Sequence, residues 1–147
     1  MLRINRQTDY AVRIILALAK GEEDSRLSSE TIQKEMLIPV SFMSRIVAKL
    51  AGCGLVITFA GRDGGLQLSR PAVDITLKDV VEAFQGPVML SECMMVTDEA
   101  NCPFQDNCQV RSKWGRVQAA MLREMASINF ADLAKETQND PNKKILP

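Results

Sequence analysis

The feature that most limits the possible folds is a β-hairpin pattern that directly follows three short helical patterns. Residues 55–59 (LVITF) are β-branched and aromatic, residues 61–65 (GRDGG) are typical of a turn, and residues 66–69 (LQLS) alternate apolar and polar side chains. Helical patterns precede the hairpin at residues 9–20, after Ser28 or Ser29, and at residues 40–51. This order predicts a mainly α fold with a small β-hairpin wing, the arrangement of a winged helix-turn-helix.

The second half of the chain is predicted to be helical, with one cysteine-containing loop. Thr76 and Asp79 resemble a capping box at the start of a helix that Gly86 and Pro87 end. A long helix is expected from about residue 109 to residue 127, and a short one at residues 130–136. The long helix carries an apolar stripe made of Trp114, Val117, Met121, Met125 and Ile128.

The helix at 40–51 is the candidate for reading DNA. Its inward stripe is Met43, Ile46, Val47 and Leu50, and its other face carries Ser41, Phe42, Ser44, Arg45 and Lys49. In a winged helix-turn-helix this helix lies in the major groove, where hydroxyl and guanidinium groups meet bases and phosphates. Phe42 is expected either to contact a thymine methyl group or to fold back onto the second helix. Arg62, in the hairpin turn, is the candidate for a minor-groove or backbone contact.

Charge gives this interpretation limited support. The net charge of the 147 residues is zero, but residues 1–70 contain 10 Lys and Arg against 7 Asp and Glu. Residues 71–147 contain 8 against 11, so the first half is the one suited to phosphates. No signal peptide or membrane-spanning run is apparent, which predicts a cytoplasmic protein with reduced thiols.

Three of the four cysteines lie close together, in the spacing C-x8-C-x5-C. Cys93, Cys102 and Cys108 precede the long helix, and the chain contains no histidine. Three soft ligands on such a loop suit an iron–sulfur cluster, zinc or redox-active thiols, although incidental buried cysteines are also compatible with the pattern. Cys53 lies between two glycines and is expected to be a small buried thiol.

Several separated motifs resemble one family. The stretches TDYAVR (8–13), IPVSFMSRI (38–46), AGCGLV (51–56), DGGLQLSRP (63–71) and ITLKDVVEAFQG (75–86) resemble the Rrf-two family of bacterial winged-helix transcriptional regulators. The resemblance implies a homodimer paired through the long helix that binds a palindromic site in double-stranded DNA. It divides the chain into a DNA-binding domain (1–72), a cluster-binding loop with a dimerisation helix (73–136) and a flexible tail (137–147). The wing departs from the family pattern, because Ala60 and Leu66 replace an arginine and a tyrosine.

The resemblance also implies a [2Fe-2S] or [4Fe-4S] cluster held by Cys93, Cys102 and Cys108. One branch of the family uses a histidine as the fourth ligand, which this chain lacks. In the nitric-oxide-sensing branch the fourth ligand is an aspartate of the other subunit, and Asp9 falls on that position. Asp9 is equally compatible with a carboxylate that favours the helix dipole. Glu92, Asp98, Glu99, Asp106, water or a small thiol are the other candidates.

The sequence therefore predicts a homodimeric, DNA-binding transcriptional regulator, acting as a repressor or activator, whose affinity for DNA depends on the cluster. The alternatives are a cluster-free regulator acting through zinc or thiol oxidation, and a module that docks onto a metabolic enzyme. An enzymatic role is not expected, because the chain has no histidine, no paired acid and base, and no phosphate-binding loop.

Overall fold

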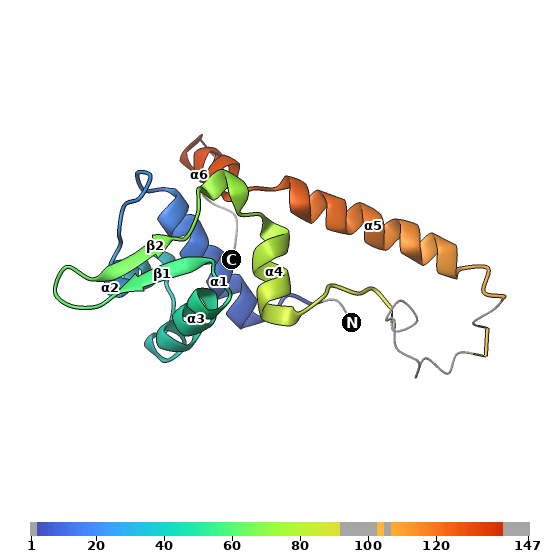
Figure 1. Cartoon of the computed structure of the whole chain (residues 1–147). Helices are drawn as coiled ribbons and strands as arrows, with labels where there is room; N and C mark the ends of the chain where they lie inside the picture. The colour runs from blue at the N-terminus through green and yellow to red at the C-terminus, as the bar shows by residue number, and fades with distance from the viewer. Residues whose placement is uncertain (1–2, 92–102, 105–106, 140–147) are drawn as a thin grey trace.

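The computed structural model describes residues 3–91, 103–104 and 107–139. The chain is mainly helical, with one two-stranded antiparallel sheet (Figure 1). Its elements in order are α1 (Arg6–Ala19), α2 (Ser29–Met36), α3 (Val40–Gly52), β1 (Val56–Phe59), β2 (Gly65–Leu68), a 3-10 turn η1 (Ala72–Asp74), α4 (Leu77–Gln85), α5 (Arg111–Ser127) and α6 (Phe130–Asn139). The predicted fold class is confirmed.

Helix α1 lies at the centre of the core, where it packs against α2, α3, α4, α6 and β2. Its buried residues include Ile14 and Ile15, neither of which is exposed. The helix begins earlier than the sequence pattern suggested. Asn5 is the N-cap, and its side-chain oxygen accepts hydrogen bonds from both the backbone N–H and the hydroxyl group of Thr8, at 2.9 and 3.1 Å. Thr8 is a fully buried residue inside the first turn of α1.

The turn between α2 and α3 is short and sharply bent. Ser28 caps α2 by accepting from the N–H of Thr31 at 3.0 Å, as predicted. Leu37 ends α2 in the left-handed region with φ of 53°, and Pro39 precedes α3. These two residues turn the chain so that α3 can place Met43, Ile46 and Leu50 in the core.

The hairpin is joined to the helices through its second strand. Val56 pairs with Leu68 and Phe59 with Gly65, and Leu66 exchanges backbone hydrogen bonds with Leu27 on its other side. Gly65 has φ of 155°, and a Cβ atom there would lie 2.7 Å from the carbonyl oxygen of Leu27. A glycine is therefore required where the wing meets the segment before α2.

Helices α4 and α6 complete the core from the C-terminal half of the chain. The predicted capping box of α4 is present, with Thr76 and Asp79 each bonded to the other's backbone N–H. Phe130, at the start of α6, is fully buried, and its N–H donates to the carbonyl oxygen of Ile75 at 3.0 Å. A single apolar cluster joins Phe130, Ile75 and Val80 to α1, α3 and the hairpin, so the core is continuous across residue 72.

Helix α5 is different, because it projects away from the other helices (Figure 1). None of its residues is buried, and its main packing partner among the described elements is α4. It covers Arg111–Ser127, close to the predicted range. Helix α6 continues to Asn139, beyond the predicted end at residue 136. Within the described parts of the chain, no helix has the length and apolarity needed to span a membrane.

Candidate nucleic-acid interface and metal-ligating residues

The outer face of α3 is polar and accessible. Ser41, Ser44 and Arg45 are all exposed, whereas Met43 and Ile46 on the opposite face are buried. The sequence predicted these three side chains as DNA contacts, and the structure brings them together on one surface of one helix. Two hydroxyl groups and a guanidinium in this arrangement can hydrogen-bond to base edges and phosphates. Their contact with DNA stays a prediction.

Phe42 does not fold back onto α2, which was one of the two positions expected for it, and its contact with a thymine methyl group stays a prediction. Its half-buried ring packs edge-on against Tyr10 of α1, with ring centroids 5.4 Å apart and an interplanar angle of 62°. The side chain therefore folds back onto α1, not onto α2. This contact helps to fix the orientation of α3, because aromatic pairs of this geometry are stabilising.

Two exposed apolar residues at the start of α3 were not predicted as functional. Val40 is 77% exposed and Leu37 is 80% exposed, on either side of Ile38 and Pro39. Val40 is three residues before Met43, so the helical spacing assigns it to the inward stripe. It nevertheless lies outside the core, as the first residue of α3, at the end of the helix that enters a major groove in this class of fold.

Lys49, in the last turn of α3, is directed toward α4. Its ammonium group donates a hydrogen bond to the carbonyl oxygen of Phe84 at 3.1 Å and lies 4.8 Å from the centre of the Phe84 ring. The structure does not test the DNA contact that the sequence suggested for Lys49, and the observed contact joins α3 to the end of α4. Cys53, just beyond α3, is exposed; the expectation of a buried thiol was wrong because the helix end turns it outward.

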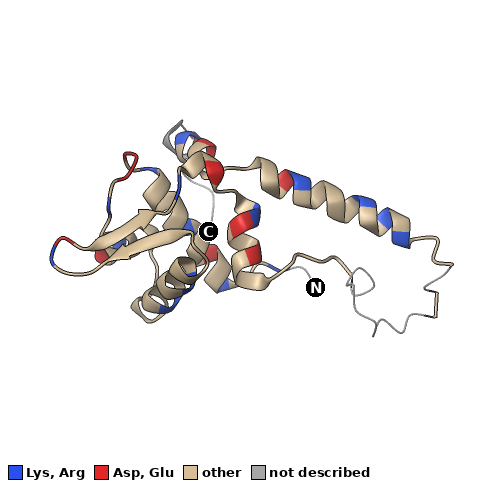
Figure 2. Ribbon diagram, in the orientation of Figure 1, with Lys and Arg blue, Asp and Glu red and all other residues tan. Residues whose placement is uncertain are grey.

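The wing presents one cation at its turn. Arg62 is exposed between β1 and β2, next to Asp63, and the hairpin extends away from the helices (Figure 2). At the turn end of β1, the guanidinium of Arg26 lies 3.5 Å above the centre of the Phe59 ring. This stacking joins β1 to the segment that precedes α2, and it helps to fix the position of the hairpin turn that carries Arg62.

The thiols are only partly within the described residues. Cys93 and Cys102 lie outside them, while Cys108 is a partly buried free thiol shortly before α5. Asp9, in the first turn of α1, is about half exposed and forms an ion pair with Arg13 at 2.9 Å. Among the described residues, no group of three or more potential ligands comes together. The chemistry of the predicted donor set, three thiols and one accessible carboxylate, nevertheless fits an iron–sulfur cluster.

The segment that leads into Cys93 is attached to α5. After Gly86 ends α4, the N–H of Leu90 donates to the side-chain oxygen of Gln118 at 3.1 Å, and the amide nitrogen of Gln118 lies 3.4 Å from the sulfur of Met89. The end of α4 is held from another side, because the Gln85 amide donates to the carbonyl oxygen of Arg3 at 2.9 Å. The end of α4 thus contacts the N-terminal residues, and the start of the cysteine segment contacts α5.

Comparison with known proteins agrees with this geometry. The family model Rrf2 (Rrf-two), described as an iron-dependent transcriptional regulator, matches residues 4–136. A Rhizobium meliloti (strain 1021) relative, protein aau3, is 33% identical over 135 residues, which are 91% of this chain and 86% of that protein.

Two further similarities concern named regulators. The HTH-type transcriptional regulator NsrR of Geobacillus kaustophilus is 26% identical over 135 residues, covering 92% of this chain and 91% of the relative. Among solved structures, CymR (YrzC), the global cysteine regulator of B. subtilis, superposes with a TM-score of 0.72 at 27% identity. That match covers 92% of this chain and 98% of CymR.

Proposed function

This chain belongs to the Rrf2 family of transcriptional regulators, and we propose that it acts as a homodimer whose affinity for DNA is set by an iron–sulfur cluster. Its family is one of regulators and not of enzymes. The observation that carries the DNA-binding part is the exposed face of α3, on which Ser41, Ser44 and Arg45 lie together. Val40 adds an apolar group suited to a thymine methyl, and Arg62 adds a cation on the wing.

Helix α5 supports the homodimer. Trp114 is 49% exposed and Val117 is 51% exposed, although they belong to the apolar stripe of the helix. A long helix with an uncovered apolar stripe is unstable alone in water, and a second copy of the same helix would cover it symmetrically. Two copies paired in this way would present two α3 helices to the two halves of a palindromic operator.

Cys93, Cys102 and Cys108 are the proposed cluster ligands, with Asp9 of the other subunit as the fourth. Cys108, a partly buried free thiol, lies just before the N-terminus of α5. A bound cluster would supply a group sensitive to iron supply, oxidants or nitric oxide. Asp9 is accessible, and its ion pair with Arg13 is a surface pair that a stronger ligand interaction can replace.

The contacts of α4 provide a physical connection from the cysteine segment to α3. Lys49 joins α3 to Phe84, two residues before Gly86, and Gln118 joins the beginning of the cysteine segment to α5. A change in the position of residues 87–91 would therefore act on α4, which Lys49 joins to α3, and on α5, which Gln118 joins to Leu90. Such a movement would change the distance between the two α3 helices of the dimer. DNA affinity depends on this distance, because both helices must match the two halves of the operator at once.

Anaerobic purification followed by iron and sulfide analysis tests the proposal. Cys93→Ser, Cys102→Ser and Cys108→Ser should each lose iron, and their DNA affinity should no longer respond to anaerobic cluster reconstitution. Cys53→Ser is the matched control, because Cys53 is an exposed thiol outside the proposed site, and it should retain both properties. Stoichiometric zinc in place of iron, or an unchanged DNA response in all three variants, would refute the cluster.

A second candidate is a regulator that acts through thiol oxidation without a cluster. It is favoured by the similarity to CymR, described as a global cysteine regulator. The same three variants separate the two proposals. In the thiol mechanism the protein contains no iron under anaerobic conditions, and an added disulfide changes DNA affinity only when the reacting cysteine is present.

A further inference from the structure

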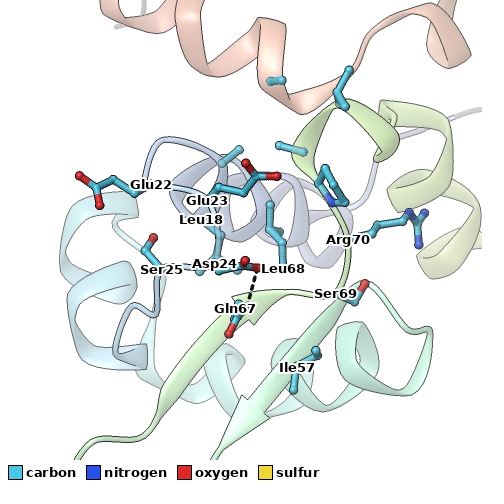
Figure 3. Close-up of a pocket in the computed structure, with 16 residues that line it drawn as sticks. Leu18, Glu22, Glu23, Asp24, Ser25, Ile57, Gln67, Leu68, Ser69 and Arg70 are labelled. Carbon is cyan, nitrogen blue, oxygen red and sulfur yellow. Dashed lines mark hydrogen bonds between the residues drawn. The ribbon is translucent and has the colours of Figure 1, made fainter.

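A groove with an apolar floor and an acidic edge lies on the side of the molecule formed by the end of α1, the hairpin and α6 (Figure 3). Its volume is about 490 Å³. The floor includes Leu18 and Leu68, and Ala131 of α6 contributes to the lining. The groove is separate from the outer face of α3 and from α5, so the function proposed above does not use it.

Two large apolar side chains in the groove are left uncovered. Val73 is 57% exposed and Ile57 is 44% exposed. A segment that covered them would gain the free energy of removing this apolar surface from water. An occupant of the groove must therefore carry apolar side chains.

The acidic edge adds a charge requirement. Glu22, Glu23 and Asp24 follow α1, and the side chains of Glu22 and Glu23 have no ion pair or hydrogen bond among the described residues. Asp24 accepts from the amide of Gln67 at 3.1 Å, which fixes this loop to β2. In Figure 3 Glu23 and Asp24 lie beside Leu18 and Leu68, while Glu22 extends outward.

Arg70 is the one cation among the described residues that line the groove, and it is already paired. Arg70 donates from Nε to the carbonyl oxygen of Asp74 at 3.0 Å, and another of its nitrogens lies 3.6 Å from a carboxylate oxygen of Asp79. The acidic edge therefore keeps its negative charge. An occupant should carry positive charge next to its apolar side chains.

The chain contains such a segment directly after α6. Lys143 and Lys144 are followed by Ile145 and Leu146, and α6 ends at Asn139. From Ala131 to Asn139 the helix rises about 12 Å, and the next four residues can span about 13 Å when extended. The segment is thus long enough to return from the end of α6 to the groove.

We propose that the groove binds residues 143–146 of the same chain, with the two lysines at the acidic edge and Ile145 and Leu146 over Val73 and the floor. Occupation would join α6 to the loop after α1 and to the base of the wing. The bound segment would then stabilise the packing of α6 on the DNA-binding domain, independently of any cluster.

A fluorescein-labelled peptide of residues 138–147 provides the test, titrated into dimeric protein truncated after Asn139. Fluorescence anisotropy should show saturable binding to the truncated protein. The full chain should bind the peptide at least about 10-fold more weakly, because its own segment competes at a high effective concentration. Amide shifts of Gln67, Leu68 and Ser69 should differ between full and truncated chains.

Charge reversal separates the groove from nonspecific attraction. Glu23→Lys should weaken peptide binding up to about fivefold, and a peptide with Lys144→Glu should recover much of that loss. Glu35→Lys, an exposed acidic position on α2, is the matched control and should change little. Equal effects of the two reversals would overturn the proposal.

Two other results would also overturn it. One is the absence of peptide binding to the truncated protein. Circular dichroism would show that this protein is folded, so that the absence of binding is not due to unfolding. The other is a loss of DNA affinity on removal of residues 140–147 without any groove binding, which would assign the lysines to phosphate contacts.

Discussion

The ammonium group of Lys49 donates a hydrogen bond to the carbonyl oxygen of Phe84, which joins the last turn of α3 to the end of α4. Phe84 is two residues from Gly86, where α4 ends and the path to the cysteines begins. The same lysine also lies over the Phe84 ring. One side chain therefore joins α3 to the end of α4, two residues before the path to the cysteines begins.

We predict that Lys49→Met reduces the effect of cluster reconstitution on DNA affinity while leaving the salt dependence of binding unchanged. Methionine keeps much of the apolar stem but loses the hydrogen bond to Phe84. DNA binding measured over a series of salt concentrations distinguishes this role from a phosphate contact. A contact with phosphate would lower the slope of log K against log salt by about 1 on substitution. Arg62→Ala serves as the comparison, because its slope is expected to fall by that amount.

Val40 and Phe42 should have opposite roles although they lie two residues apart. Val40→Ala should weaken operator binding about 3- to 10-fold through loss of an apolar contact, with little effect on stability, because Val40 is mostly exposed. Phe42→Ala should lower the free energy of unfolding by about 1–3 kcal/mol through loss of its packing on Tyr10. Gel-shift assays measure the operator affinity of both variants, and urea unfolding measures their stability. The assignment would be contradicted if Val40→Ala were the more destabilising change.

Substitutions on α5 test whether the proposed homodimer is paired through this helix. Val117→Glu places a charge in the uncovered stripe and should shift the protein to monomer, as measured by sedimentation. Ala126→Glu is the matched control. It is exposed and nine residues further along, which places it about 180° away around the helix. If both variants remained dimeric, α5 would not be the dimer interface.

Phe130→Ala should be strongly destabilising. The ring is fully buried in the core that α1, α4 and α6 share, and its removal is expected to cost about 3–5 kcal/mol of unfolding free energy. Phe104→Ala provides the comparison, because that ring is 68% exposed and the change should cost no more than about 0.5 kcal/mol. Urea denaturation followed by circular dichroism measures both, and a similar midpoint for the two variants would contradict the role of Phe130.

Features that depend on neighbouring residues were predictable from the sequence. The capping box of Thr76 and Asp79, the Ser28 cap and the hairpin all follow from short local patterns, and the structure confirms them. The start of α1 was placed too late, because Asn5 is outside the apolar periodicity that marks the helix. Thr8 resembles a cap in the sequence, but its hydroxyl is satisfied by Asn5 and buried.

Features that depend on distant residues were less accessible to prediction. The contact of Phe42 with Tyr10 and that of Lys49 with Phe84 each join separate helices, so no local spacing reveals them. The exposure of Val40 could not be read from the helical period, because the period does not show that the core ends before the first residue of α3. The proposed cluster ligands stay a prediction, because Cys93 and Cys102 lie outside the described residues.

The burial of Phe130 means that the two parts of the chain on either side of the cysteine segment share one core. The chain leaves the core after Val88 and returns to it at α6, where Phe130 bonds to Ile75 and Asn129 pairs with Thr76. A single backbone cleavage between these two points would leave both pieces with buried contacts to each other. The protein is thus suited to reconstitution from two separately produced fragments that meet at one break in the cysteine segment.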